Sequence, residues 1–112
     1  MTTCRRGDVV LVGFVFSDES GVKLRPALVV SSDAYHRSRQ EAVVAAITSS
    51  VRRPLVGDHR VLRWKEAGLL FPSVVTGIVR TIKQSMIRRR LGSLLAGDAK
   101  AVDAALRRAL DL

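Results

Sequence analysis

The chain has 112 residues, a formal net charge of +9, and a composition that is 47% hydrophobic but only 4% aromatic. That length predicts one domain with an aliphatic core, and the positive charge favours a polyanionic partner such as RNA, DNA or an acidic protein. The single cysteine excludes an internal disulfide framework and a cysteine-rich zinc site, and no apolar run approaches the roughly 18–20 residues that span a membrane.

In the first half of the chain, apolar runs alternate with polar segments. Val9–Phe16 is rich in Val and Phe, which favours a strand. Pro26–Ser31 predicts a second strand, since a proline without an N–H belongs at a strand's first residue or edge. Ala42–Ile47 predicts a third. The polar segments Ser17–Gly21 and Ser32–Glu41 predict loops, the second with room for one helical turn.

The second half predicts further short strands and then a helix. Glycine, proline and polar residues separate the apolar runs that we expect to be strands, which are Arg60–Trp64, Leu69–Leu70, Ser73–Thr76, Val79–Ile82 and Met86–Arg90. The apolar period then changes, because Leu95, Ala99, Val102, Leu106 and Ala109 recur at helical spacing and share one helix face. Asp98 falls in the first turn of this helix, where a carboxylate suits the helix dipole.

Together these elements predict the fold class. About six or seven short strands followed by one helix indicate a mainly β protein with a C-terminal helix, in the form of a small, strongly bent barrel. The sequence shows no repeat and no linker, so we expect residues 1–112 to form a single domain. Trp64, the only tryptophan, is expected to be half-buried in the barrel, and an aromatic platform for a base is the alternative.

Polar residues at strand ends are the candidates for chemistry, because the common catalytic and metal-binding motifs are absent from the sequence. His36 and His59 have no partner at metal-ligand spacing, so we expect neither a metal nor another cofactor. Arg25 directly precedes the second strand and Thr48 directly follows the third. If these strands are antiparallel neighbours, Arg25 and Thr48 meet at one rim of the barrel. A surface ion pair for Arg25 and a simple turn at Thr48 are the alternative.

Several segments, taken together, resemble the MazF/PemK family of toxins. In chain order they are Gly7–Val12, Arg25–Ser31, Val44–Ser49, Pro72–Val75, Ile78–Ile82 and Ala101–Leu106. Each segment alone is unspecific, whereas four or five of them in register are specific. The resemblance implies an SH3-like small barrel of the MazF/PemK/CcdB kind that forms a homodimer, with RNA bound along the dimer groove.

The resemblance also implies an activity and a set of site residues. It implies a sequence-selective, metal-independent endoribonuclease that cleaves single-stranded RNA or mRNA and acts as a growth-inhibiting toxin until an acidic antitoxin neutralises it. The family's catalytic arginine falls on Arg25, and its catalytic threonine or serine falls on Thr48. The candidate RNA contacts are Ser17, Asp18, Lys23, Ser49, Arg52, Arg53 and Arg80.

Cleavage without a metal most simply uses the 2′-OH of the substrate as the nucleophile, which restricts the reaction to RNA. Arg25 suits stabilisation of charge on the phosphorane, since guanidinium binds phosphate oxygens in a fork. Deprotonation of a guanidinium at neutral pH would cost roughly 7 kcal/mol, so Arg25 suits general-base work poorly. Thr48 would hydrogen-bond a phosphate oxygen or the 2′-OH. The general base is unassigned: His36 fits by chemistry, and an exposed loop histidine is the alternative.

Two other functions fit the same fold class, since a fold does not determine a function. One is a non-enzymatic poison of DNA gyrase of the CcdB type, and the other is an RNA-binding barrel without activity. The gyrase poison has no use for Arg25 placed against Thr48, whereas all three functions predict a basic surface, so charge does not separate them. We expect the run Arg88–Arg90 to be solvated, with contact to RNA backbone or to an acidic antitoxin as the alternatives. We also expect a cytoplasmic protein, because Val9–Phe16 is followed by no cleavage pattern of a signal peptide.

Overall fold

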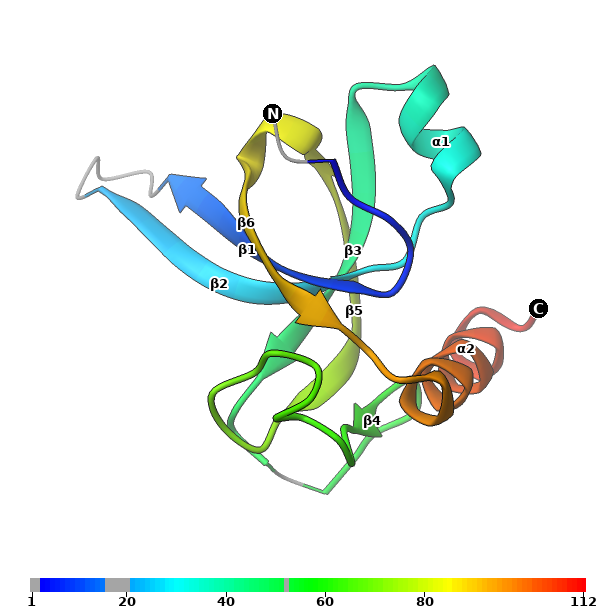
Figure 1. Cartoon of the computed structure of the whole chain (residues 1–112). Helices are drawn as coiled ribbons and strands as arrows, with labels where there is room; N and C mark the ends of the chain where they lie inside the picture. The colour runs from blue at the N-terminus through cyan, green and yellow to red at the C-terminus, as the bar shows by residue number, and fades with distance from the viewer. Residues whose placement is uncertain (1–2, 16–20, 52) are drawn as a thin grey trace.

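Six strands form a single antiparallel sheet that bends on itself, and one long helix packs against it (Figure 1). The computed structural model describes residues 3–15, 21–51 and 53–112. In chain order the elements are β1 (Asp8–Val15), β2 (Val22–Val29), α1 (Asp33–Ser38), β3 (Glu41–Thr48), β4 (His59–Arg60), β5 (Val74–Lys83), a 3₁₀ turn η1 (Gln84–Met86), β6 (Ile87–Ser93) and α2 (Ala96–Leu110). The strand order across the sheet is β4-β5-β3-β2-β1-β6. The fold is therefore a half-open barrel with a C-terminal helix, and the predicted fold class is confirmed.

The sheet buries apolar side chains on both of its faces. One core cluster joins the sheet to α2 and includes Val9, Leu28, Ala45, Val75, Val102 and Leu106. The other cluster includes Cys4, Val10, Val12, Val29, Val44, Ile82 and Ile87. Successive residues of a strand point to opposite faces, so a strand that is covered on both sides needs an unbroken apolar run. This explains why the central strands lack the alternation of apolar and polar residues that a half-exposed sheet shows.

The predicted strand Arg60–Trp64 is wrong for most of its length, since β4 contains only His59 and Arg60. The backbone N–H groups of Leu62 and Arg63 donate instead to the buried carboxylate of Asp98, at 2.9 and 3.0 Å. A backbone N–H that is bonded to a side chain is not available to a neighbouring strand. The chain therefore turns away from the sheet after Val61.

The segment between β4 and β5, residues 61–73, contains no strand. Leu69–Leu70 was predicted as one, but Leu69 N donates to Trp64 O at 3.0 Å and closes a turn. Gly68 in this turn has a φ of +90°, a conformation that favours glycine. The runs predicted as separate strands at Ser73–Thr76 and Val79–Ile82 belong to one long strand, β5.

Both helices differ in detail from the prediction. The expected loop Ser32–Glu41 contains the six-residue helix α1, whose N-cap Ser32 accepts from Tyr35 N at 3.2 Å. On α2, Val102 and Leu106 are buried as predicted, but Leu95 and Ala109 at its two ends are exposed. Asp98 is only 3% exposed, because it anchors residues 62 and 63 rather than facing solvent. Within the described ranges, neither helix is long and apolar enough to cross a membrane.

Candidate active site

Arg25 and Thr48 lie at facing ends of neighbouring strands. β2 and β3 are antiparallel, and their ladder pairs Ala27 with Ala46. The paired residues end there, and the same register continued by two residues would set Arg25 opposite Thr48. Residues opposite one another in an antiparallel pair point to the same face of the sheet. The strand topology therefore brings together the two positions that the sequence placed at one rim of the barrel.

A hollow of about 440 Å³ contains both positions. Its lining consists of Leu11, Arg25, Pro26, Ile47, Thr48, Ser49, Leu69, Leu70, Phe71, Ser73 and Leu91. The walls are mainly apolar, and a guanidinium and two hydroxyl groups come to the same rim from β2 and from the end of β3. Ligand sites in proteins commonly have this composition, an apolar lining with a few convergent polar groups.

The guanidinium of Arg25 is available to a ligand. The Arg25 side chain is exposed, and its Nη1 makes a long contact of 3.5 Å with Leu24 O. Among the residues that the structure describes, no carboxylate forms an ion pair with Arg25. An exposed arginine without an acidic partner retains its donors for a phosphate. The surface ion pair considered as the alternative for Arg25 is absent from this described part.

Thr48 is half-buried, and its hydroxyl is held in place by the backbone that follows. Its Oγ1 accepts a hydrogen bond from Ser50 N at 3.1 Å. The turn predicted after β3 is therefore present. A hydroxyl that accepts from the backbone still carries its own proton, which it can donate to a ligand oxygen. The turn at Thr48 and a contact with substrate are thus compatible.

A second hollow, of about 530 Å³, adjoins the first. Phe14, Lys23, Ala27, Val44, Ala46, Ile78 and Arg80 line it together with the three residues that both hollows share, Arg25, Pro26 and Ile47. The guanidinium carbon of Arg80 lies 4.8 Å from the centre of the Phe14 ring, which is a cation–π contact. Arg25 therefore lies between two hollows, with further basic residues beside the second.

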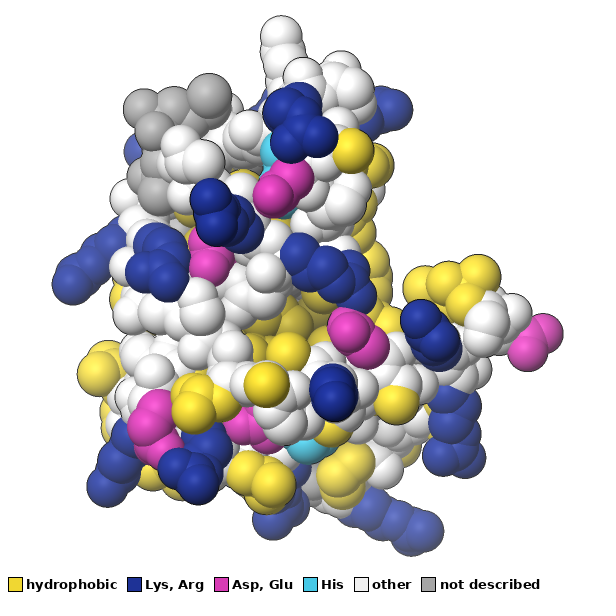
Figure 2. All heavy atoms as spheres, turned by 45° about the vertical axis from the view of Figure 1, so that its right-hand side comes forward, with side chains coloured by type: hydrophobic (Ala, Val, Ile, Leu, Met, Phe, Trp, Pro, Cys, Tyr) yellow, Lys and Arg dark blue, Asp and Glu magenta, His cyan; other side chains and the backbone are white. Residues whose placement is uncertain are grey.

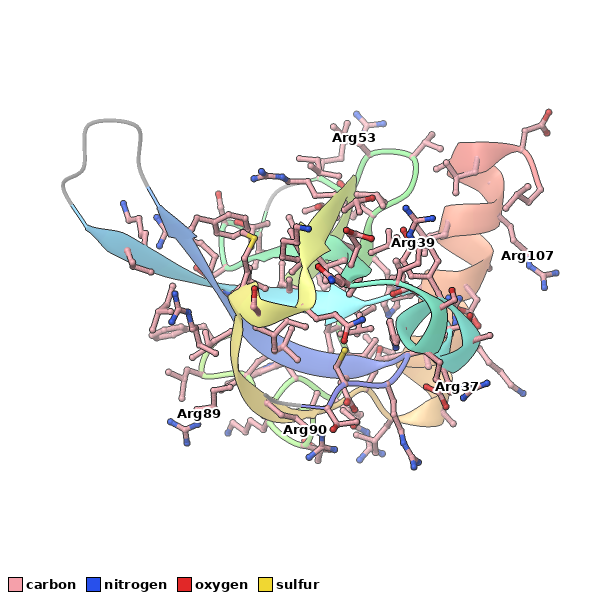
Figure 3. All side chains as sticks on the ribbon, turned by 90° about the horizontal axis from the view of Figure 1, so that it is seen from above. Arg37, Arg39, Arg53, Arg89, Arg90 and Arg107 are labelled. Carbon is pink, nitrogen blue, oxygen red and sulfur yellow. The ribbon has the colours of Figure 1, made fainter. Side chains whose placement is uncertain are left out.

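The structure gathers five of the predicted site residues around these hollows: Arg25, Thr48, Lys23, Ser49 and Arg80. Arg53 is exposed but lines neither hollow. Viewed from above, its side chain projects outward on the side of the molecule opposite Arg89 and Arg90 (Figure 3). Ser17, Asp18 and Arg52 lie outside the described residues.

Sequence reasoning missed the apolar rim of the first hollow. Leu70 and Phe71 are 81% and 62% exposed and border the same hollow as Arg25. They were overlooked because Leu69–Leu70 was assigned to a strand. The one available signal was the Phe71–Pro72 pair directly before β5, since the residue before a proline is restricted to an extended conformation.

The segment 61–73 is anchored to α2 by the carboxylate of Asp98. In addition to the two backbone N–H groups, Asp98 Oδ1 accepts from His59 Nε2 at 2.8 Å. Burial by itself, the largest influence, would raise the pKa of Asp98, but the hydrogen bonds from Leu62 N, His59 and Arg63 N together lower it below its usual 3.8. Asp98 is thus an ionised carboxylate beneath the segment that carries one rim of the hollow.

His36 and Trp64 lie away from the two hollows. His36 belongs to α1 and is half-buried, with its Nε2 2.6 Å from Ser31 Oγ, so the exposed loop histidine is wrong. It lines neither of the two hollows that contain Arg25. Trp64 is half-buried against the core, as predicted. The general base remains unassigned.

On one face of the molecule, positive charge is scattered rather than gathered in one patch (Figure 2). Several Lys and Arg side chains project from the edges of that face. Arg88, Arg89 and Arg90 are exposed on the edge strand β6, and Arg90 Nε lies 3.2 Å from Asp8 Oδ1. That this run is solvated rather than in contact with RNA or an antitoxin stays a prediction. In the described part of the chain, no group of three or more His, Cys, Asp or Glu side chains could hold a metal ion.

Comparisons with known proteins agree on one family. The pattern of the family described as PemK-like, MazF-like toxins of type II toxin–antitoxin systems matches residues 5–110. The endoribonuclease MazF6 of Mycobacterium tuberculosis is 37% identical over 99 residues, which is 86% of each chain. The endoribonuclease EndoA of Bacillus subtilis is 31% identical over 112 residues, or 96% of this chain and 95% of that protein. A solved mycobacterial endoribonuclease in complex with its cognate antitoxin superimposes with a TM-score of 0.77 at 22% identity, covering 98% and 97% of the two chains.

Proposed function

This chain belongs to the family of PemK-like, MazF-like toxins of type II toxin–antitoxin systems, and we propose that it is an endoribonuclease that cleaves single-stranded RNA at a centre built on Arg25 and Thr48. The observation that carries the proposal is that both residues line one hollow, and that no described carboxylate neutralises the arginine. The two curated relatives, both endoribonucleases, support the class of reaction.

The proposed reaction uses the substrate's own 2′-OH. The 2′-OH gives up its proton as its oxygen attacks the adjacent phosphorus, the bond to the 5′ oxygen breaks, and that oxygen takes up a proton, so the products are a 2′,3′-cyclic phosphate and a 5′-OH. The guanidinium of Arg25 binds two non-bridging oxygens and stabilises the charge that develops on the phosphorane. The hydroxyl of Thr48, fixed by Ser50 N, donates to a phosphate oxygen and orients the group for attack. Neither role requires a metal ion.

The basic side chains of the second hollow would continue the RNA path beyond the reacting phosphate. Lys23 and Arg80 line that hollow together with Arg25, and phosphate contacts of this kind supply affinity without sequence information. We propose that Ser49 contacts RNA at the other side, where it shares the first hollow with Thr48. For Ser17, Asp18, Arg52 and Arg53 the proposal rests on the resemblance of the sequence alone.

The proposal extends to the partners of a toxin. Family membership implies a cognate antitoxin, and an acidic segment would complement a chain of net charge +9. A homodimer is also part of the proposal, since a 112-residue domain buries a modest share of its surface and gains stability by association. With mRNA as the proposed substrate, the proposed site of action is the cytoplasm.

Incubation of the purified protein with mixed-sequence RNA in the presence of EDTA tests the function. We expect discrete cuts that leave 5′-OH ends. Arg25→Ala should lower the cleavage rate by about 10²–10³-fold, the usual effect of removing a group that stabilises transition-state charge. Thr48→Val should slow cleavage and Thr48→Ser should retain it, because only serine keeps the hydroxyl. Arg89→Ala, an exposed arginine that lines neither hollow, is the control.

Three results would point elsewhere. Wild-type cleavage rates in Arg25→Ala would refute the proposed centre. RNA that is retarded in a gel but never cut would indicate a binding protein without activity. Intact RNA together with gyrase-linked DNA breaks would indicate a poison of the CcdB type. Light scattering of the purified protein, with an expected mass of two chains, tests the homodimer.

A further inference from the structure

We propose that the ring of Phe71 is the platform on which a nucleobase of the single-stranded substrate stacks, next to the phosphate held at Arg25. This inference rests on the proposed function and adds a binding residue that neither the sequence motifs nor the catalytic roles include. It concerns the apolar rim of the first hollow, which is the wall that Leu70 and Phe71 contribute.

The first observation is the exposure of the ring. Of the aromatic side chains that the structure describes, Phe14, Tyr35 and Trp64 are half-buried, and only Phe71 is exposed, at 62%. All three of the others are already covered by cations, since Arg80 lies over Phe14, Lys65 over Trp64 and Arg39 over Tyr35. The face of Phe71 thus remains open to solvent in a chain that contains few aromatic residues.

The second observation is the position of the ring. Phe71 lines the same hollow of about 440 Å³ as Arg25, Thr48 and Ser49. A nucleotide whose phosphate contacts Arg25 would have its base within reach of the hollow's other wall. Single-stranded nucleic acid is bound in this manner elsewhere, with a basic group on the backbone and an aromatic face under the base. The net charge of +9 favours such a polyanion over other ligands.

The third observation is that the platform is held in place before any ligand binds. Pro72 restricts Phe71 to an extended conformation. Ser73 is 4% exposed and donates from Oγ to the carbonyl of Phe71 at 2.7 Å, and Val61 N donates to Ser73 O at 3.0 Å. A ring on a backbone that is already ordered loses little entropy when a base stacks on it.

Stacking should give affinity for single strands with little sequence preference, because every base has a π-face. Bases inside a duplex are not available, so the contribution of Phe71 should disappear for double-stranded RNA. These two properties distinguish a stacking residue from a residue that only supports the fold.

Fluorescence anisotropy with labelled, mixed-sequence 2′-O-methyl oligonucleotides tests the inference, since this probe binds without being cut. For the single strand we expect Phe71→Ala to raise Kd by roughly fivefold to a hundredfold. Phe71→Trp should bind as tightly as the wild type, whereas Phe71→Leu should bind weakly like the alanine variant. The Kd for the corresponding duplex should be unchanged in every variant. Leu62→Ala is the matched control, because Leu62 is 76% exposed in the same segment but lines neither hollow.

An unchanged Kd for the single strand in Phe71→Ala would overturn the inference. A wild-type Kd in Phe71→Leu would also overturn it, because that result would indicate apolar contact without stacking. The inference would also be overturned if Phe71→Ala lost binding to a synthetic peptide of glutamate and leucine but bound RNA as the wild type does. That result would assign the rim to an acidic protein. Cleavage of mixed RNA by the wild type separates the two proposals. If the wild type cleaves and Phe71→Ala binds normally, the stacking inference fails and the endoribonuclease remains.

Discussion

Replacing Asp98 with alanine should destabilise this protein far more than an ordinary loss of a surface charge. Asp98 is 3% exposed and accepts three hydrogen bonds, from His59 Nε2 and from the backbone N–H groups of Leu62 and Arg63. A hydrogen bond to a charged group contributes about 1.5–3 kcal/mol. Water can reach some of the abandoned donors, because residues 62 and 63 are exposed, so we expect a total loss of about 3 kcal/mol.

Thermal unfolding measures this loss. For a domain of this size, 1 kcal/mol lowers Tm by about 4 °C, so Asp98→Ala should unfold about 12 °C below the wild type. Asp103→Ala is the matched control on the same helix. The Asp103 side chain is 48% exposed and pairs with Arg6 at 2.6 Å, and a surface ion pair of this kind contributes at most about 1 kcal/mol. Equal shifts in the two variants would refute the reasoning.

The pH dependence gives a second test of the same carboxylate. The pKa of Asp98 in the folded protein lies below its usual 3.8, so the ionised form stabilises the fold at any pH above that usual value. This contribution is lost as the pH falls through the lowered pKa. The Tm difference between the wild type and Asp98→Asn should therefore shrink as the pH falls below about 4. A difference that does not change with pH would contradict an ionised Asp98.

Two further predictions concern a tight backbone contact and the second hollow. Gly68→Ala should destabilise the fold by more than about 2 kcal/mol, because the added Cβ would lie 2.2 Å from Leu91 O at a residue with a φ of +90°. Gly97→Ala is the control, because no atom lies within 4 Å of its added Cβ, and it should unfold at or above the wild-type Tm. If both variants unfold alike, the contact is not tight. Arg80→Ala should weaken RNA binding and reduce the slope of log K against log salt by about 1. Arg107 lines neither hollow, so Arg107→Ala should leave the slope unchanged. Equal slopes in the two variants would remove Arg80 from the RNA path.

The candidate centre could be predicted because it depends on local signals. Arg25 and Thr48 each adjoin a strong apolar run, so the end of each strand is visible in the sequence. Their proximity then follows from one further condition, that β2 and β3 are antiparallel neighbours, and the ladder from Ala27–Ala46 meets that condition. Lys23 and Arg80 of the second hollow could be predicted for the same reason, because basic residues beside strands can be recognised in the sequence.

The opposite rim was missed because contacts distant in sequence decide it. Asp98 binds residues that are 35 to 39 positions earlier in the chain, and no local pattern indicates such a pairing. The apolar alternation of 60–64 was therefore interpreted as a strand. Once the N–H groups of Leu62 and Arg63 are taken by Asp98, the chain turns, and the following residues bring Phe71 to the hollow.

By itself, then, the sequence determined the class of fold, the helix at the C-terminal end, the resemblance to a toxin family, and the placement of Arg25 and Thr48. Apolar periodicity and strand ends are local properties, which is why they could be recognised from the order of residues alone. Only the tertiary structure decided that Asp98 is buried, that segment 61–73 leaves the sheet, and that Phe71 faces the same hollow as Arg25. A buried carboxylate is stable only where several donors converge on it, and the complete fold is needed to bring those donors together.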